Sequence, residues 1–245
     1  TYNHSASALS IGTTPETTEL QVWYDATVAG TLYSATTGGT VLSVDGATVM
    51  RWEDISGNGA HLYGNAITSI QTKFKIGVVN GKNAVRCDGN DILQSLTNVC
   101  TNVRNSVFVY YVAKYTSLTQ GSVTGFRKYS FVNLTSSTGN NLQLGSTPTT
   151  ALFQNYQSIN RVWDLNPFLI GAGYADLTTA QFFINGVSYP VSNSSGAEAH
   201  VSRALTLGNQ ILAGDICEVL IYGTLPTQAQ RQAIETYLRN KWAIY

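Results

Sequence analysis

The alternation of apolar and polar residues divides most of the chain into short segments typical of β-strands. Leu20–Asp25 alternates cleanly at its start, residues 107–113 form a continuous apolar and aromatic run, and residues 181–189 read as a hairpin around Asn185-Gly186. Residues 216–222 are rich in β-branched and aromatic side chains between two glycines, which predicts a strand buried on both faces. Further strands are predicted at 49–52, 83–87, 92–95, 129–134 and 204–208.

A helix is predicted only at the end of the chain. Thr227 and Gln230 have the spacing of a capping box, in which each side chain satisfies a backbone amide of the first helical turn. The apolar stripe that follows has helical spacing, and Glu235 is expected to pair with Arg239 on the solvent side. Its members are Ile234, Tyr237, Leu238 and Trp242. The pattern as a whole therefore predicts an all-β antiparallel sandwich closed by a short C-terminal α-helix.

Composition excludes two classes of partner. Charged residues make up only 11% of the 245 residues, and 14 basic side chains balance 14 acidic ones, so the chain has no basic field for nucleic acid. No apolar run reaches the roughly 18 residues of a membrane span, so membrane insertion is not expected. Residues 1–19, rich in Ser and Thr, read as an arm or linker, and residues 20–245 as one domain.

The cysteine count indicates free thiols. Cys87, Cys100 and Cys217 are odd in number, and Cys87 and Cys217 sit within apolar strand patterns, where a thiol behaves as a small hydrophobic group. So few cysteines in so long a chain favour folding in a reducing cytosol.

Several ordered segments carry a resemblance to a known family. They are residues 20–26 (LQVWYDA), 52–61 (WEDISGNGAH), 84–91 (AVRCDGND), 183–186 (FING), 214–222 (GDICEVLIY) and 231–238 (RQAIETYL), followed by Lys241 and Trp242. In this order they resemble the laminin G-like jelly roll of the concanavalin A-like lectin and glucanase superfamily. The resemblance implies a jelly-roll sandwich. It also implies a glycan-binding, adhesion or structural role on a bacterial or phage surface.

Catalysis is not expected from these residues. Glucanases of the superfamily carry acidic residues two positions apart on a strand, which point into one cleft, and this chain has no Glu-x-Asp pair. Asp215 and Glu218 are three positions apart, a spacing that places two side chains on opposite faces of a regular strand. The sequence thus predicts a protein that is not an enzyme.

One segment has the composition of a sugar site. Residues 153–163 are rich in aromatic and amide side chains and match no family pattern, and Asn155, Tyr156, Arg161 and Trp163 are its candidate ligand-binding residues. Flat rings stack on sugar faces while amides and guanidinium groups bind hydroxyls. The same composition also suits a strand edge or a subunit contact.

Calcium is the one cofactor that the sequence suggests. Asp54, Asp88 and Asp91 lie in Gly- and Asn-rich turns and offer the oxygen ligands that Ca²⁺ prefers. The alternative is that these carboxylates cap tight turns. Trp23, Trp52 and Trp242 are expected in the core rather than at a sugar.

Two functions follow from the sequence. The first is a lectin-like module for glycan binding or adhesion, displayed on an extracellular surface or a phage virion, with a glycan as its partner. The second is a structural or decoration protein of a virion that binds a neighbouring structural protein and no glycan. Either is compatible with an oligomer or assembly subunit.

Overall fold

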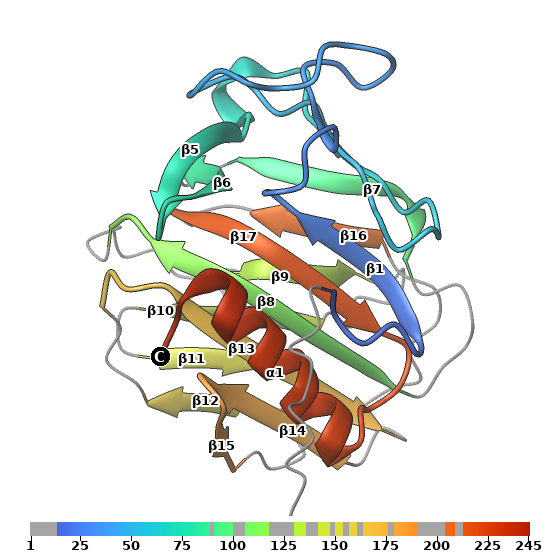
Figure 1. The fold of residues 1–245 in the computed structure, drawn as a ribbon, viewed down its shortest axis with the longest axis vertical. Helices are drawn as coiled ribbons and strands as arrows, with labels where there is room; N and C mark the ends of the chain where they lie inside the picture. The colour runs from blue at the N-terminus through green and yellow to red at the C-terminus, as the bar shows by residue number, and fades with distance from the viewer. Residues whose placement is uncertain are drawn as a thin grey trace, which may run out of the picture.

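Two antiparallel β-sheets packed face to face form the protein, as a computed structural model shows (Figure 1). The structure describes residues 14–88, 91–99, 106–117, 130–135, 142–147, 150–153, 157–160, 164–175, 179–190, 204–208 and 213–245. This confirms the predicted all-β sandwich with one C-terminal helix.

The helix-side sheet lies against α1 (Gln228–Trp242). Its strands run in the order β15 (Val187–Tyr189), β14 (Thr179–Ile184), β13 (Phe168–Ala175), β8 (Val107–Tyr115), β17 (Ala213–Tyr222), β6 (Lys82–Asp88) and β5 (Lys73–Val79), with β1 (Leu20–Asp25) paired to β17. The second sheet has the order β12 (Gln157–Asn160), β11 (Thr150–Phe153), β10 (Leu142–Thr147), β9 (Ser130–Thr135), β16 (Ala204–Gly208), β7 (Ile92–Asn98), β4 (Leu62–Gly64), β3 (Arg51–Trp52) and β2 (Leu32–Tyr33).

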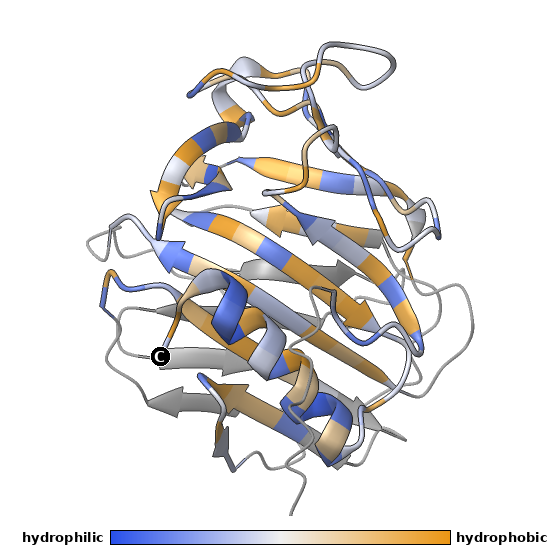
Figure 2. Ribbon diagram, viewed as in Figure 1, coloured by the Kyte–Doolittle hydropathy of each residue, from blue (hydrophilic) through white to orange (hydrophobic). Residues whose placement is uncertain are grey.

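Strand β17 is the centre of the helix-side sheet. It pairs with β8 along one edge, while the other edge is shared by β6, next to its first half, and β1, next to its second half. All ten of its residues are buried, which confirms the prediction of a strand covered on both faces. Figure 2 shows β17 beside α1, with hydrophobic segments along much of its length.

Two separate cores flank the helix-side sheet. Along β8, Val109 and Tyr111 face the core between the sheets, whereas Phe108, Tyr110 and Val112 face the core under α1. This period-two alternation is what a pleated strand requires, and both faces are apolar because a helix covers the outer one.

Helix α1 begins as predicted. The Thr227 side chain accepts a hydrogen bond from the Gln230 amide, and the Gln230 side chain accepts one from the Thr227 amide, so the capping box is confirmed. The predicted stripe of Ile234, Tyr237, Leu238 and Trp242 is buried against the sheet. With each large side chain contributing about 1.5–3 kcal/mol by burial, packing holds this helix in place.

The predicted Glu235–Arg239 pair is wrong. Glu235 is buried and makes its ion pair with Arg231, one turn earlier, whose guanidinium lies over the Phe183 ring. Hairpin β14–β15 covers this side of the helix, and a helical pattern alone gives no information about such a neighbour.

The predicted separation of Asp215 and Glu218 is also wrong. The register between β17 and β8 shifts between Ile216 and Glu218, and Cys217 and Glu218 both face the helix side. Asp215 precedes the inward-facing Ile216 and therefore faces the same side as Glu218. An irregularity of this kind breaks the period-two rule.

Other predictions meet mixed outcomes. The hairpin at Asn185-Gly186 is confirmed, with positive φ at both positions as a two-residue turn requires. Strands β13 and β5 were not predicted, because Gly171, Gly173 and Gly77 interrupt their apolar patterns. In the described residues, the only helical element before α1 is a 3₁₀ turn, Thr68–Ile70, and no helix there is long and apolar enough to cross a membrane.

Side-chain burial agrees with the sequence for Trp52, Trp242 and the two described cysteines, whereas Trp23, also expected in the core, is only partly buried. Trp52 and Trp242 are fully buried, and Cys87 and Cys217 are buried thiols in β6 and β17, whereas Cys100 lies outside the described residues. Of the predicted arm, residues 14–19 are described, and Glu16 and Glu19 accept hydrogen bonds from Tyr222 and Gly223 at the end of β17.

Candidate functional site

A cleft of about 360 Å³ opens beside the C-terminal end of α1. Four separate segments line it: the β5–β6 turn, the loop before β13, the β14–β15 turn and the residues after α1. The lining residues are Asn80, Asp164, Asn166, Pro167, Phe168, Asn185, Ala243, Ile244 and Tyr245. Loops at one end of a rigid sandwich are a common place for a binding site.

Asn80 fixes the wall next to the helix. It occupies the tight turn between β5 and β6 with φ of 49°, a conformation that Asn tolerates better than most residues. Its Nδ2 donates to the Trp242 carbonyl at 2.6 Å and to the Ala243 carbonyl at 3.1 Å. These are the carbonyls that the end of a helix leaves without intrahelical partners, so Asn80 holds the C-terminus of α1 in place.

Asn185 fixes the opposite wall. Its Oδ1 accepts a hydrogen bond from the Leu169 amide at 2.9 Å, which ties the β14–β15 turn to the start of β13. An amide side chain has two N–H donors in addition to its oxygen, and in the described residues these donors have no other partner. They are available to a ligand in the cleft.

Asp164 and Asn166 form the exposed rim. The Asp164 carboxylate accepts from the Asn166 backbone amide at 2.9 Å and from Asn166 Nδ2 at 2.8 Å, a local Asx-type turn. An ionised carboxylate has about four acceptor positions, so two are left for a ligand.

Tyr245 supplies an aromatic ring to the cleft. The side chain is 52% exposed, and its ring lies near Gly186 of the β14–β15 turn. Burial, and then the nearby Glu235 carboxylate, raise the pKa of Tyr245 to about 12, so its hydroxyl stays protonated and can donate a hydrogen bond. Amide, carboxylate and phenol groups beside a ring face suit a ligand that has both hydroxyl groups and an apolar face.

The four predicted ligand-binding residues, Asn155, Tyr156, Arg161 and Trp163, lie outside the described residues, so their role stays a prediction. The predicted segment ends at Trp163, and the rim of the cleft begins with the next residue in the sequence. The other cleft residues come from distant parts of the chain, and their single asparagines carry no local signal of a shared site.

Asp54 caps a turn, which is the alternative that its sequence context offered. Its Oδ1 accepts from the amides of Trp23 and Ser56, each at 2.9 Å, and its Oδ2 accepts from Ser56 Oγ and from the Ala60 amide. The carboxylate therefore joins the 52–61 loop to β1. These donors occupy the oxygens that a calcium ion would need.

Asp88 and Asp91 meet each other across their turn but not Asp54. The Asp88 amide donates to Asp91 Oδ2 at 2.9 Å, and burial raises the pKa of Asp91 to about 6. In the described part of the chain, no three His, Cys, Asp or Glu side chains come close enough to hold a metal ion. The three predicted ligands are thus not gathered into one site.

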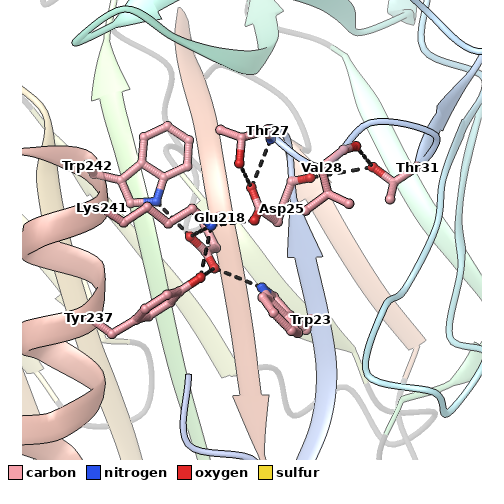
Figure 3. A network of polar contacts seen from close by, with 9 residues as sticks. All are labelled: Trp23, Asp25, Thr27, Val28, Thr31, Glu218, Tyr237, Lys241 and Trp242. Carbon is pink, nitrogen blue, oxygen red and sulfur yellow. Dashed lines mark hydrogen bonds and ion pairs between the residues drawn. The ribbon is translucent and has the colours of Figure 1, made fainter. Parts of the chain in front are cut away.

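A buried polar network lies between α1 and the helix-side sheet, with Glu218 at its centre (Figure 3). Glu218 accepts hydrogen bonds from Trp23 Nε1 at 2.8 Å, from the Tyr237 hydroxyl at 2.8 Å and from Trp242 Nε1 at 2.7 Å. Lys241 contacts both Glu218 and Asp25. Because neither carboxylate is open to solvent, this network fastens the helix to the sheet and has no access for a substrate.

No protein-family model matches the sequence, and no curated protein matches it either. Solved structures do share the fold. Trypanosoma rangeli sialidase in complex with sialic acid matches with a TM-score of 0.57 and 9% identity, over 92% of this chain and 34% of that one. An arabinofuranosidase complexed with arabinofuranosyl-alpha-1,2-xylobiose matches with a TM-score of 0.60 and 12% identity, over 89% and 62%.

The receptor binding domain of botulinum neurotoxin C/D mosaic serotype also matches, with a TM-score of 0.57 and 10% identity, over 89% of this chain and 51% of that one. At such low identities these likenesses show the fold alone, a β-sandwich. The chain spans between 34% and 62% of these solved chains. None of the three is a virion protein, so the predicted virion or phage location gains no support.

These comparisons overturn the prediction that the chain is not an enzyme. A sialidase and an arabinofuranosidase are glycoside hydrolases, and both contain this fold. The prediction rested in part on separate faces for Asp215 and Glu218, and the irregularity in β17 removes that argument. The lack of a Glu-x-Asp pair argues only against the glucanases that use this motif, because other glycosidases place their carboxylates differently.

Proposed function

We propose that this chain is a lectin-like carbohydrate-binding module and that the cleft beside Tyr245 holds the sugar. The observation that carries the proposal is the lining of the cleft, where Asn185 and Asp164 offer donors and acceptors and Tyr245 offers a ring face. A sugar has hydroxyl groups around its edge and apolar C–H faces, so it matches such a lining.

The fold comparisons support the same class of ligand. One matched structure is described with sialic acid and another with arabinofuranosyl-xylobiose, and a third is a receptor-binding domain. The ordered segments from residues 20 to 242 support a laminin G-like jelly roll within the β-sandwiches. We propose display on a cell or particle surface, with a glycan as the partner, as the setting of this activity.

A glycan array probed with the purified chain tests the proposal. Wild-type protein is expected to bind a defined set of glycans, and Tyr245→Ala to lose about fivefold or more in affinity, because stacking on an aromatic ring contributes about 1 kcal/mol or more. Tyr63→Ala is the matched control, since Tyr63 is a partly buried tyrosine of β4 that does not line the cleft. Melting curves show whether both variants stay folded.

Two results would count against the proposal. One is an array on which the wild-type protein binds nothing. The other is a glycan signal that Tyr245→Ala and Tyr63→Ala reduce equally, because that result would place the sugar elsewhere on the molecule.

A further inference from the structure

The charge of the cleft lining bears on which glycans, neutral or acidic, the cleft can bind. In the described residues, Asp164 is the only ionisable side chain of the lining besides the Tyr245 hydroxyl, and no lysine or arginine lines the cleft. Arg231 and Arg239 of α1 lie close enough to influence Tyr245 but are not lining residues, and Arg231 is paired with Glu235. The described lining itself therefore carries a negative side-chain charge and no positive one.

Hydrogen-bond chemistry gives the same preference. The carboxylate of Asp164 only accepts hydrogen bonds, so its two remaining positions need donors such as sugar hydroxyls. A carboxylate on a sialic acid or a uronic acid is also only an acceptor. If such a carboxylate faced Asp164, the two groups could not hydrogen-bond to each other, because both only accept, and their negative charges would repel.

Asn185 and Tyr245 add further hydrogen-bonding groups that suit the neutral hydroxyl groups of a sugar. The Nδ2 donors of Asn185 suit a hydroxyl oxygen, and the Tyr245 hydroxyl can both donate and accept. None of these groups supplies the paired, charge-assisted donors with which proteins hold carboxylates, phosphates or sulfates.

We infer that the cleft selects uncharged glycans and rejects glycans that carry a carboxylate or sulfate at the bound residue, with Asp164 as the specificity-determining residue. This inference rests on the proposed function, because it specifies which sugars the same cleft accepts. Two like charges about 5 Å apart near a protein surface repel strongly enough to lower affinity by about tenfold or more.

Paired glycans test the inference directly. The probes are lactose-terminated and sialyllactose-terminated chains, together with xylo-oligosaccharides with and without glucuronic acid side groups. Wild-type protein is expected to bind the neutral member of any pair that it recognises at least about tenfold more tightly than the acidic member. Asp164→Asn keeps the size of the side chain and an acceptor for the Asn166 amide, and it is expected to reduce that ratio by about tenfold.

Glu53→Gln is the matched control, because Glu53 is a surface carboxylate paired with Arg51 and does not line the cleft. It should leave the ratio unchanged. Equal or tighter binding of the acidic members by the wild-type protein overturns the inference and leaves the proposed function standing. A ratio that Asp164→Asn does not alter also overturns it, whereas absence of binding to every probe overturns the proposed function and the inference together.

Discussion

Asp25 and Glu218 lie directly opposite each other on β1 and β17, and the Lys241 ammonium contacts both carboxylates. Glu218 is fully buried and Asp25 is 2% exposed. Burial, and then the Asp25 carboxylate, raise the pKa of Glu218, while Lys241 opposes that rise. The Lys241 ammonium therefore offsets the repulsion between two buried carboxylates where the helix contacts the sheet.

Replacing this cation is expected to destabilise the fold strongly. Lys241→Met leaves two uncompensated buried carboxylates, and breaking a buried ion pair in this way costs about 3–5 kcal/mol. Urea unfolding at neutral pH measures the loss. Lys75→Met is the control, because the Asp45 carboxylate of the Lys75–Asp45 pair lies at the surface, so the loss of this pair should destabilise the fold far less. Equal losses for the two variants would contradict a structural role for the Glu218 network.

The contribution of Asp91 to the stability of the folded state is expected to fall as pH rises. Because burial raises the pKa of folded Asp91 to about 6, above an ordinary value near 4, the folded state binds this proton more tightly than the unfolded state. The stabilisation is complete at low pH and is lost as pH rises through about 6. Asp91→Asn should therefore melt several degrees higher than the wild-type protein at pH about 8, and this advantage should vanish near pH 4.

Asp45→Asn is a control of opposite sign for that experiment. The hydrogen bond from Lys75 lowers the pKa of Asp45, so this group stabilises the folded state above its ordinary pKa and loses that effect as pH falls. Its replacement should give a small loss at neutral pH that disappears in acid. A melting temperature of Asp91→Asn that tracks the wild-type value at every pH would contradict the burial of this carboxyl group.

Asp54 is expected to matter for stability whether or not calcium is present. Asp54→Ala removes the acceptor for the amides of Trp23, Ser56 and Ala60, and leaving buried donors without partners costs about 1–3 kcal/mol or more. Asp54→Asn should cost less because it keeps one acceptor oxygen. Melting curves with added calcium and with a chelator should coincide for each variant. A calcium-dependent shift that Asp54→Asn abolishes would show that this carboxylate binds the ion instead.

Gly173 has no room for a side chain. A methyl group there would lie 2.1 Å from the Val107 carbonyl oxygen and 2.6 Å from Phe108 Cα, both on the neighbouring strand β8. Because backbone atoms cannot move aside, Gly173→Ala should cost at least about 1–3 kcal/mol, the usual range for overpacking. Gly171→Ala should cost less, since the nearest atoms there belong to the Tyr110 side chain. Thermal unfolding of both variants compares the two positions.

The elements that sequence predicted well are those with local signals. Thr227 and Gln230 give the start of α1, and Asn185-Gly186 gives the hairpin, because caps and tight turns depend on a few neighbouring residues. The burial of both faces of β17 was also readable, since no polar face interrupts its pattern. The order of the strands in each sheet was not predicted, because it depends on pairings between residues far apart in the sequence.

The parts that sequence missed depend on distant neighbours. Glu235 reads as a solvent-side residue in a helical pattern, and only the hairpin that packs beside it explains its burial with Arg231. Asp215 and Glu218 share a face because of a register shift that no residue spacing reveals. The cleft joins Asn80, Asp164 and Asn185, each of which is an ordinary turn residue in its own segment.

The pairing of β1 with one edge of β17 joins the start of the described chain to a strand near its end, which affects how the protein folds. Trp23 of β1 and Glu218 of β17 are hydrogen-bonded across 195 positions of sequence, so β1 leaves the ribosome long before its partner strand exists. Pairings this far apart in sequence slow folding, and an unpaired strand invites aggregation while it waits. Late synthesis of β17 therefore completes the helix-side sheet, and chaperone dependence should be concentrated in the interval before that strand emerges.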